Sequence, residues 1–203
     1  MFRPYPYQQE CLDALAHTRQ QHLKHGLVVM ASGLGKTVTA AFDVKRWLQN
    51  HGGRILYLCH QNEILEQARN TFEAVIGDNH TFGYFHGREK NLHEVSCLFA
   101  SFQTMREWRN AFFQKEFDYV VVDESHHGPA PTYRPTIEYF QPKFLLAITA
   151  TPERTDLQDL QQMYGSEVFS LHLGEALARG LLSLVDYRLM TDELQLQSVL
   201  ETP

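Results

Sequence analysis

The stretch that most constrains this chain is residues 27–37, with the sequence LVVMASGLGKT. Its apolar residues 27–30 predict a strand that is buried on both faces of a parallel sheet. Two glycines then allow a tight turn with inward-pointing N–H groups, and residues 37–48 are predicted to form a helix. Because a helix N-terminus carries partial positive charge and Lys36 adds a mobile cation, this stretch predicts a phosphate-binding loop of the P-loop type.

One position departs from the general P-loop pattern G-x-x-x-x-G-K-[ST]. The first glycine of that pattern is Met30 in this sequence, whereas the final residues Gly35, Lys36 and Thr37 match. The Thr37 hydroxyl is a suitable ligand for the magnesium ion that accompanies a nucleotide. The alternative is a glycine-rich turn followed by Lys-Thr by chance. The order of strand, loop and helix favours phosphate binding.

The composition of the chain is that of one globular domain. Its 203 residues are 43% hydrophobic, which is enough for a full core. No apolar run approaches the ~20 residues that span a membrane. The first residues lack a basic segment followed by an apolar one, so a secretory signal is not expected. The formal net charge of −6 argues against nucleic-acid binding through a broadly basic surface, although helix N-termini could still hold phosphates. The scattered thiols Cys11, Cys59 and Cys97 predict a reducing, cytoplasmic setting without disulfides.

Predicted strands and helices alternate along the chain. Apolar and β-branched runs predict strands at residues 27–30, 54–59, 81–86, 95–102, within 117–127 and at 144–151, with a weaker one at 186–190. Helical spacing of apolar residues predicts helices from about residue 8 to Gly26 and at residues 37–48, 60–76, 103–113, 133–140, 156–163 and 173–178. This alternation predicts a three-layer α/β fold, with helices on both faces of a mostly parallel sheet.

A second chemical signal is the acidic pair Asp123-Glu124, which ends the strand predicted within residues 117–127. In open parallel sheets, ligands collect at the carboxyl ends of the strands, and the P-loop also leaves its strand at such an end. We therefore expect both groups to converge. Asp123 is then placed to hold magnesium, and Glu124 to orient or deprotonate an attacking water. The alternative is an acid that caps a helix, next to a surface glutamate.

The adjacent histidines His126 and His127 invite a zinc interpretation. Neighbouring histidines on one loop rarely bind the same metal ion, and no cysteine or further histidine lies at ligand spacing from them. We therefore interpret His126 as a polar link between the acidic pair and the next strand.

Together these motifs resemble those of the first RecA-like domain of superfamily 2 helicases and translocases of the DExH type. The resemblance runs from about Arg3 to about Leu182. The matching segments, in the order of the family's motifs, are RPYPYQQECL, MASGLGKT, LYLCHQNEILEQA, ASFQTM, VVVDESHHG and LAITATPERTD. The phrases TATPERTD and EALARGLL are most similar to the branch that contains the motor subunits of type I and type III restriction enzymes and related repair helicases. RNA-directed members remain an alternative.

The resemblance implies a RecA-like P-loop NTPase domain over residues 1–182, with residues 183–203 beginning the linker to a second RecA-like domain. It implies ATP and Mg2+ as cofactors, and nucleic acid as partner, DNA in preference to RNA. It implies adenine recognition by Gln8. It implies phosphate binding by Ser32, Gly33, Leu34, Gly35, Lys36 and Thr37, metal binding by Thr37 and Asp123, and hydrolysis by Lys36, Asp123, Glu124 and His126.

For the remaining motifs the resemblance implies contact with nucleic acid and coupling to the nucleotide state. The predicted nucleic-acid contacts are His60, Gln61, Ser101, Gln103 and Thr104, and the predicted coupling residues are Thr149 and Thr151. For all seven residues, simple capping of a helix or a strand end is the alternative.

Family members need the second domain to supply arginines to the transition state, and no second unit of that size fits after residue 182. We therefore expect weak or undetectable ATPase activity from these residues alone, and no unwinding. Two other classes of function stay open. One is a small-molecule phosphotransferase, which would need an acceptor pocket and a lid. The other is a scaffold in which ATP acts only as a switch.

Overall fold

A computed structural model of the chain describes residues 2–87, 89–90, 95–125, 133–150 and 154–183. Within these ranges the chain forms an eight-stranded sheet with the strand order β4-β3-β5-β2-β6-β7-β1-β8. The strands are β1 (His25–Met30), β2 (Ile55–Cys59), β3 (Phe82–His86), β4 (Glu89–Lys90), β5 (Cys97–Ser101), β6 (Tyr119–Val122), β7 (Phe144–Thr149) and β8 (Glu167–Leu171). Only the β3–β4 pair is antiparallel, so the mostly parallel sheet predicted from the sequence is confirmed.

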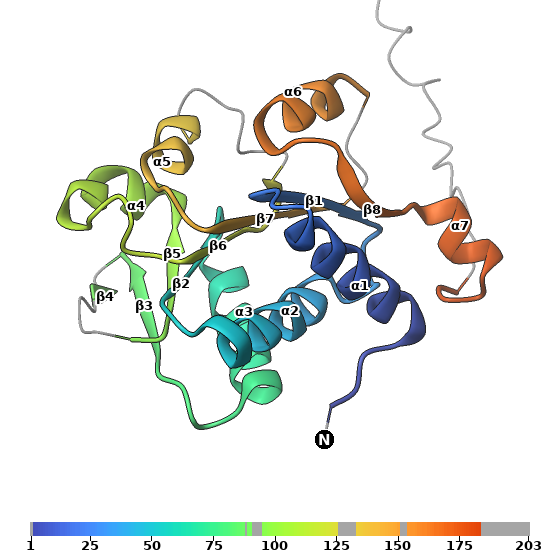
Figure 1. The fold of residues 1–203 in the computed structure, drawn as a ribbon, viewed down its shortest axis with the longest axis horizontal. Helices are drawn as coiled ribbons and strands as arrows, with labels where there is room; N and C mark the ends of the chain where they lie inside the picture. Colours follow the sequence, from blue (N-terminus) through green and yellow to red (C-terminus); the bar gives the residue numbers. More distant parts are fainter. Residues whose placement is uncertain (1, 88, 91–94, 126–132, 151–153, 184–203) are drawn as a thin grey trace, which may run out of the picture.

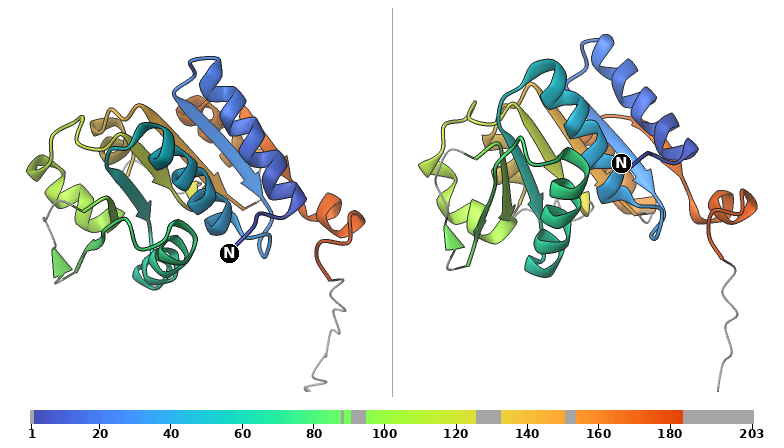
Figure 2. Two further views of the ribbon diagram at one scale, coloured as in Figure 1. Left: turned by 60° about the horizontal axis from the view of Figure 1, so that its bottom comes forward. Right: turned by 90° about the horizontal axis from the view of Figure 1, so that it is seen from below.

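Helices cover both faces of the sheet and complete the three predicted layers (Figure 1). On one face lie α1 (Pro6–Gln20), α2 (Lys36–His51) and α3 (Asn62–Ile76), which cross the front of the sheet in Figure 2. On the other face lie α4 (Phe102–Trp108), the short 3-10 helix η1 (Arg109–Ala111), α5 (Arg134–Tyr139) and α6 (Arg154–Tyr164). A last helix, α7 (Leu173–Ala178), follows the edge strand β8. Within the described residues, no helix combines the length and the apolar character that crossing a membrane requires.

The central strands are buried on both faces, which explains their nearly continuous apolar sequences. In β1, Val28 and Met30 join the core beneath α1, α2 and α3, whereas Leu27 and Val29 join the core beneath α4, α5 and α6. Successive side chains of a strand point to opposite faces, so one short run supplies two cores. Because β1, β6 and β7 are parallel, their carboxyl ends lie at one edge of the sheet.

The first helix differs from its prediction at both ends. It begins at Pro6 rather than near Gln8, because proline is well suited to the first turn of a helix, and it ends at Gln20. Gly26 does not end it but lies inside β1. A Cβ atom at Gly26 would come within 2.9 Å of Leu15 Cδ2, so this glycine lets α1 pack closely on the strand.

Other boundaries also differ from the sequence prediction. Helix α3 begins at Asn62 rather than at residue 60, because Gln61 is extended and serves as its N-cap. The helix predicted at residues 103–113 is divided into α4 and η1 at Trp108. The two-residue strand β4 and the edge strand β8 are absent from the sequence prediction. The strand expected at residues 186–190 lies outside the described residues.

Candidate functional site

The P-loop leaves the end of β1 and leads directly into α2. Gly33 and Gly35 both adopt left-handed backbone conformations, with φ of 86° and 73°. A Cβ atom at Gly35 would lie 2.9 Å from Gln8 Nε2, so the loop requires glycine there for both its conformation and its packing. The Leu34 side chain is buried and anchors the loop, whereas Ser32 is exposed and Lys36 and Thr37 are half-buried at the first turn of α2.

Gln8 connects the first turn of α1 to this loop. Its Oε1 accepts a hydrogen bond from the Tyr5 backbone at 3.0 Å, and its Nε2 donates to the Leu34 carbonyl at 3.3 Å. The Tyr7 hydroxyl donates to the same carbonyl at 3.1 Å. Gln8 is only 2% exposed. The structure therefore gives Gln8 a role in holding the P-loop that the sequence analysis did not predict.

Asp123 follows the last residue of β6 and is 3% exposed. Its Oδ1 accepts a hydrogen bond from the Glu124 backbone at 2.9 Å, and its Oδ2 accepts one from the Tyr57 hydroxyl. Burial raises the pKa of Asp123 above its usual value, although these two hydrogen bonds and the nearby positive charge of Lys36 act in the opposite direction. The P-loop and the acidic pair follow parallel strands that end at the same edge of the sheet, close enough for the charge of Lys36 to act on this carboxyl group.

Tyr57 makes the connection between them. Its side chain is fully buried in β2, and its hydroxyl donates a hydrogen bond to Asp123 Oδ2. Burial and the charge of Asp123 raise the pKa of Tyr57, and the Thr37 side chain lies close enough to the hydroxyl to act in the opposite direction. The sequence analysis missed this residue. The available signal was a tyrosine in a strand that is otherwise apolar, since a buried tyrosine hydroxyl usually has a partner.

Glu124 has a backbone conformation that is unusual for a residue other than glycine. Its φ is +50°, in the left-handed region that non-glycine residues seldom adopt. Such conformations cost on the order of 1–3 kcal/mol and cluster at functional sites. Glu124 is half-buried, and its charge raises the pKa of both Asp123 and the neighbouring Cys59. The chain therefore turns sharply after β6 and keeps the two carboxyl groups close together.

The donor set at this site suits a nucleotide phosphate with magnesium. A threonine hydroxyl and an aspartate carboxylate are hard oxygen ligands of the kind that magnesium accepts. The two left-handed glycines free the loop of Cβ atoms where phosphate oxygens would approach its N–H groups. A lysine at the start of α2 supplies the positive charge that the phosphates require.

The residues predicted to contact nucleic acid lie at the same edge of the sheet, after β2 and β5. Ser101 Oγ accepts a hydrogen bond from the Thr104 backbone at 3.2 Å and thereby caps α4, while the Thr104 hydroxyl accepts one from the Gly87 backbone at 3.3 Å. Both hydroxyls are buried, which favours capping as the role of these two side chains. Residues Asn62, Gly87, Ser101, Gln103, Thr104 and Glu107 line a pocket of about 170 Å³ there.

Gln61 and Gln103 are exposed at the beginnings of α3 and α4. The His60 side chain is also exposed, and its Nδ1 lies 2.8 Å from the Tyr133 hydroxyl. Thr149 ends β7, is fully buried, and pairs in register with Val29 of β1, directly before the P-loop. The predicted site residues His126 and Thr151 lie outside the described residues.

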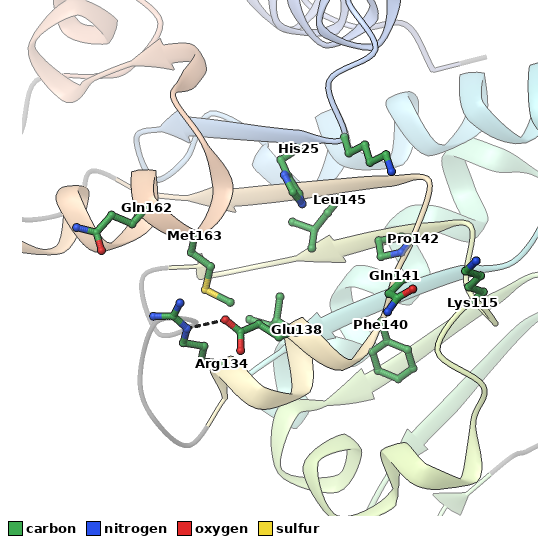
Figure 3. Close-up of a pocket in the computed structure, with 12 residues that line it drawn as sticks. His25, Lys115, Arg134, Glu138, Phe140, Gln141, Pro142, Leu145, Gln162 and Met163 are labelled. Carbon is green, nitrogen blue, oxygen red and sulfur yellow. Dashed lines mark hydrogen bonds and ion pairs between the residues drawn. The ribbon is translucent and has the colours of Figure 1, made fainter.

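A pocket of about 540 Å³ lies elsewhere, near the amino ends of β1 and β7 (Figure 3). His25, the first residue of β1, lines it together with Met163 of α6 and an ion pair between Arg134 and Glu138, whose Nε and Oε1 atoms are 2.7 Å apart. Because the P-loop and Asp123 lie at the carboxyl ends of the strands, this pocket is not part of the phosphate site.

Known proteins are similar to this chain in sequence and in fold. The family model described as "Type III restriction enzyme, res subunit" matches residues 1–154. A Halobacterium salinarum protein, whose name describes a candidate DNA 3'-5' helicase, is 35% identical over 156 residues, which cover 74% of this chain and 24% of that protein. The Escherichia coli type I restriction enzyme EcoAI endonuclease subunit is 29% identical over 189 residues, which cover 89% of this chain and 23% of that subunit.

Solved structures of restriction-enzyme and helicase proteins have a similar fold. A fragment of a candidate HsdR subunit of a Vibrio vulnificus type I restriction enzyme has a TM-score of 0.66 at 27% identity, over 87% of this chain and 32% of that one. The Pyrococcus furiosus Hef helicase domain has a TM-score of 0.71 at 18% identity, over 91% of this chain and 41% of that one. The chain thus spans about a quarter of the length of its curated relatives. It belongs to the family of type III restriction enzyme res subunits, and its fold is that of the first RecA-like domain of superfamily 2 helicases and translocases.

Proposed function

We propose that this chain is the first motor domain of an ATP-dependent DNA helicase or translocase of the restriction or repair type. The observation that carries the proposal is the meeting of Thr37 and Asp123 at the Tyr57 hydroxyl, at the carboxyl edge of the sheet. The names of its relatives, a DNA helicase and a restriction-enzyme subunit, support DNA rather than RNA as the partner.

In this proposal the P-loop binds the phosphates of ATP. The N–H groups of residues 32–37 would surround the phosphate oxygens, and Lys36 would offset their negative charge. Thr37 and Asp123 would hold Mg2+, which, when bound, supplies further positive charge beside the phosphoryl group that is transferred. Gln8 would recognise adenine by exchanging the contacts that its amide makes to Tyr5, Leu34 and Gly35 for contacts to the base.

Hydrolysis would depend on Glu124. Its left-handed backbone turns the residue away from the direction of β6, beside Asp123, where its carboxylate would orient an attacking water and accept its proton. His126, two residues further on, would link this site to the end of β7. There Thr149 and Thr151 would transmit the nucleotide state to the nucleic-acid surface.

DNA would lie along the edge formed by the ends of β2 and β5. Because the Ser101 hydroxyl caps the Thr104 N–H and the Thr104 hydroxyl accepts from the Gly87 N–H, these two residues would contribute by holding the start of α4 in place beside the nucleic acid. The exposed side chains of His60, Gln61 and Gln103 would make the remaining contacts. Such contacts bind phosphates without reading bases, so binding would be weak, independent of sequence and sensitive to salt.

The proposal includes a second RecA-like domain, to which residues 183–203 would lead from a domain formed by residues 1–182. That domain would supply arginines to the transition state, so residues 1–203 alone would hydrolyse ATP weakly or not measurably. Brisk, DNA-stimulated turnover by this chain alone would contradict this part of the proposal. A cytoplasmic location is also proposed, and the three buried free thiols support it.

Binding of a fluorescent ATP analogue in the presence of Mg2+ tests the proposal. The chain should bind it, Lys36→Ala should abolish binding, and Glu124→Gln should keep binding but lose any hydrolysis. A scaffold would be indifferent to Glu124→Gln. Transfer of phosphate to a metabolite in a substrate screen would instead favour a phosphotransferase. Unchanged affinity in Lys36→Ala would exclude the proposed nucleotide site.

A further inference from the structure

The Tyr57 side chain is held rigidly between two parts of the proposed nucleotide site. Its ring is fully buried and packs against Phe72 and Phe99, with centroids 5.3 Å away in both cases. Its hydroxyl reaches the carboxyl edge of the sheet, where it meets Thr37 from the first turn of α2 and Asp123 from the end of β6. Since the ring is fixed by packing, the position of the hydroxyl is fixed as well.

The hydrogen-bonding capacity of a phenol explains why this position matters. A tyrosine hydroxyl has one proton to donate and can accept hydrogen bonds at its oxygen. Tyr57 gives its proton to Asp123 Oδ2, while Asp123 Oδ1 is held by the Glu124 backbone at 2.9 Å. The carboxylate is thus held at both oxygens, with the Thr37 side chain beside the same hydroxyl.

We propose that Tyr57 is a positioning residue for the metal: it holds Asp123 beside Thr37 in the arrangement that accepts Mg2+ before the nucleotide arrives. This inference rests on the proposed function, because it assumes that the site binds magnesium with a nucleotide. Tyr57 would touch neither the metal nor the reacting atoms and would act only through Asp123, which it holds. Partners of metal ligands commonly change metal affinity 10–100-fold when they are removed.

An ordinary buried tyrosine that only satisfies its hydroxyl in the core is the alternative, and the chain contains a matched example. Tyr119 is also fully buried, and its hydroxyl donates to a buried carboxylate, Asp43 Oδ2, at 2.6 Å. Asp43 lies within α2 and is paired with Arg19 rather than with the P-loop. Tyr57→Phe and Tyr119→Phe therefore remove the same group from the same kind of surroundings, and only the first affects the proposed metal ligands.

The test is the magnesium dependence of nucleotide binding by the whole chain. A fluorescent ADP analogue is titrated in EDTA and then at increasing Mg2+ concentrations. Tyr57→Phe should raise the Mg2+ concentration for half-maximal effect by about 10-fold and leave binding in EDTA unchanged, whereas Tyr119→Phe should change neither. Unaltered magnesium dependence in Tyr57→Phe would overturn this inference and leave the proposed function standing. Absence of nucleotide binding by the unmodified chain would overturn the proposed function and this inference with it.

A second measurement keeps the hydroxyl and does not depend on whether Tyr57→Phe folds. A ring-fluorinated tyrosine is incorporated at position 57, or at position 119 as the control, and its fluorine NMR signal is recorded in the ADP complex. Adding Mg2+ should shift the signal from position 57, because Thr37 and Asp123 change their surroundings, and leave that from position 119 in place. A signal from position 57 that does not respond to Mg2+ would contradict the inference.

Discussion

Arg19 of α1 and Asp43 of α2 form an ion pair with two contacts. Arg19 Nη1 and Nη2 each lie 2.7 Å from one of the two carboxylate oxygens of Asp43. Asp43 is fully buried and also accepts a hydrogen bond from Tyr119 at 2.6 Å. The Arg19 guanidinium lies 4.9 Å from the centre of the Phe144 ring. The pair therefore ties the helix that carries Gln8 to the helix that begins at Lys36, through the core rather than at the surface.

Replacing Arg19 with Met should destabilise the fold strongly. The change leaves the Asp43 charge buried without its cation, which typically costs about 3–5 kcal/mol. Urea denaturation measures the effect, and the double variant Arg19→Met/Asp43→Leu should recover most of it. Arg46→Met is the control, because Arg46 pairs with exposed Asp13 at 3.5 Å and such pairs contribute about 1 kcal/mol or less. Equal losses in the two single variants would contradict the role of the buried pair.

Gly35→Ala should disrupt the P-loop. Alanine in the left-handed conformation costs about 1–2 kcal/mol, and the added Cβ would lie 2.9 Å from Gln8 Nε2. We expect both lower stability and loss of nucleotide binding. Gly52→Ala separates the two causes, because Gly52 also has a positive φ that strains a side chain, at φ 65° and ψ −152°, but a Cβ there meets no atom within 4 Å. Denaturation and nucleotide titration of both variants check this, and intact nucleotide binding by Gly35→Ala would be inconsistent with it.

Stability should fall between neutral pH and about pH 5, partly because of His25. Partial desolvation of His25 in the wall of the pocket in Figure 3 and the charge of Lys24 lower its pKa below the usual value, although much of the residue remains exposed. The unfolded chain therefore takes up this proton first as the pH falls, and stability is lost from about pH 6.5 downward through the lower pKa of the folded state. His25→Gln should reduce the difference in Tm between pH 7 and pH 5. An unchanged difference in Tm in His25→Gln would refute the assignment.

The three thiols should resist modification while the chain is folded. Burial raises the pKa of Cys97 to about 12 and, together with the charge of Asp123, also that of Cys59 to about 12. Burial raises the pKa of Cys11 as well. Because the thiolate is the reactive form, a thiol reagent at pH 7.5 should react with none of the three before unfolding and with all three in denaturant. Rapid modification of the native chain would show that the core opens readily.

The sequence predicted the P-loop and Asp123 because their signals are local. A strand, two glycines and Lys36 are adjacent in the chain, and Asp123 ends its own apolar run. The role of Tyr57 could not be found in this way. Its partners come from α2 and β6, and they meet only because β2 lies beside β6 in the sheet, a neighbourhood that the chain order does not reveal. The P-loop contact of Gln8 has the same origin, since it depends on where α1 packs.

Other features were missed because the local signal was weak. The edge strand β8 is partly exposed along most of its length, so it lacks the buried run that identified the central strands. The start of α3 was placed too early because the extended conformation of Gln61 is not encoded by a proline or glycine. In the sequence Gly26 predicts the end of a helix, whereas the structure needs a glycine there because Leu15 of α1 packs closely against β1. In each case tertiary packing, rather than local preference, decides the outcome.

The central claim is that the P-loop and the acid after β6 hold one magnesium–nucleotide complex. A crystal structure of the chain with Mg2+ and a non-hydrolysable ATP analogue tests it most directly. The account predicts the phosphates against Lys36 and the loop N–H groups, with the metal between the terminal phosphates, Thr37 and Asp123. Finding the nucleotide elsewhere, for example in the pocket lined by His25 and Arg134, or finding the metal away from Asp123, would contradict the account.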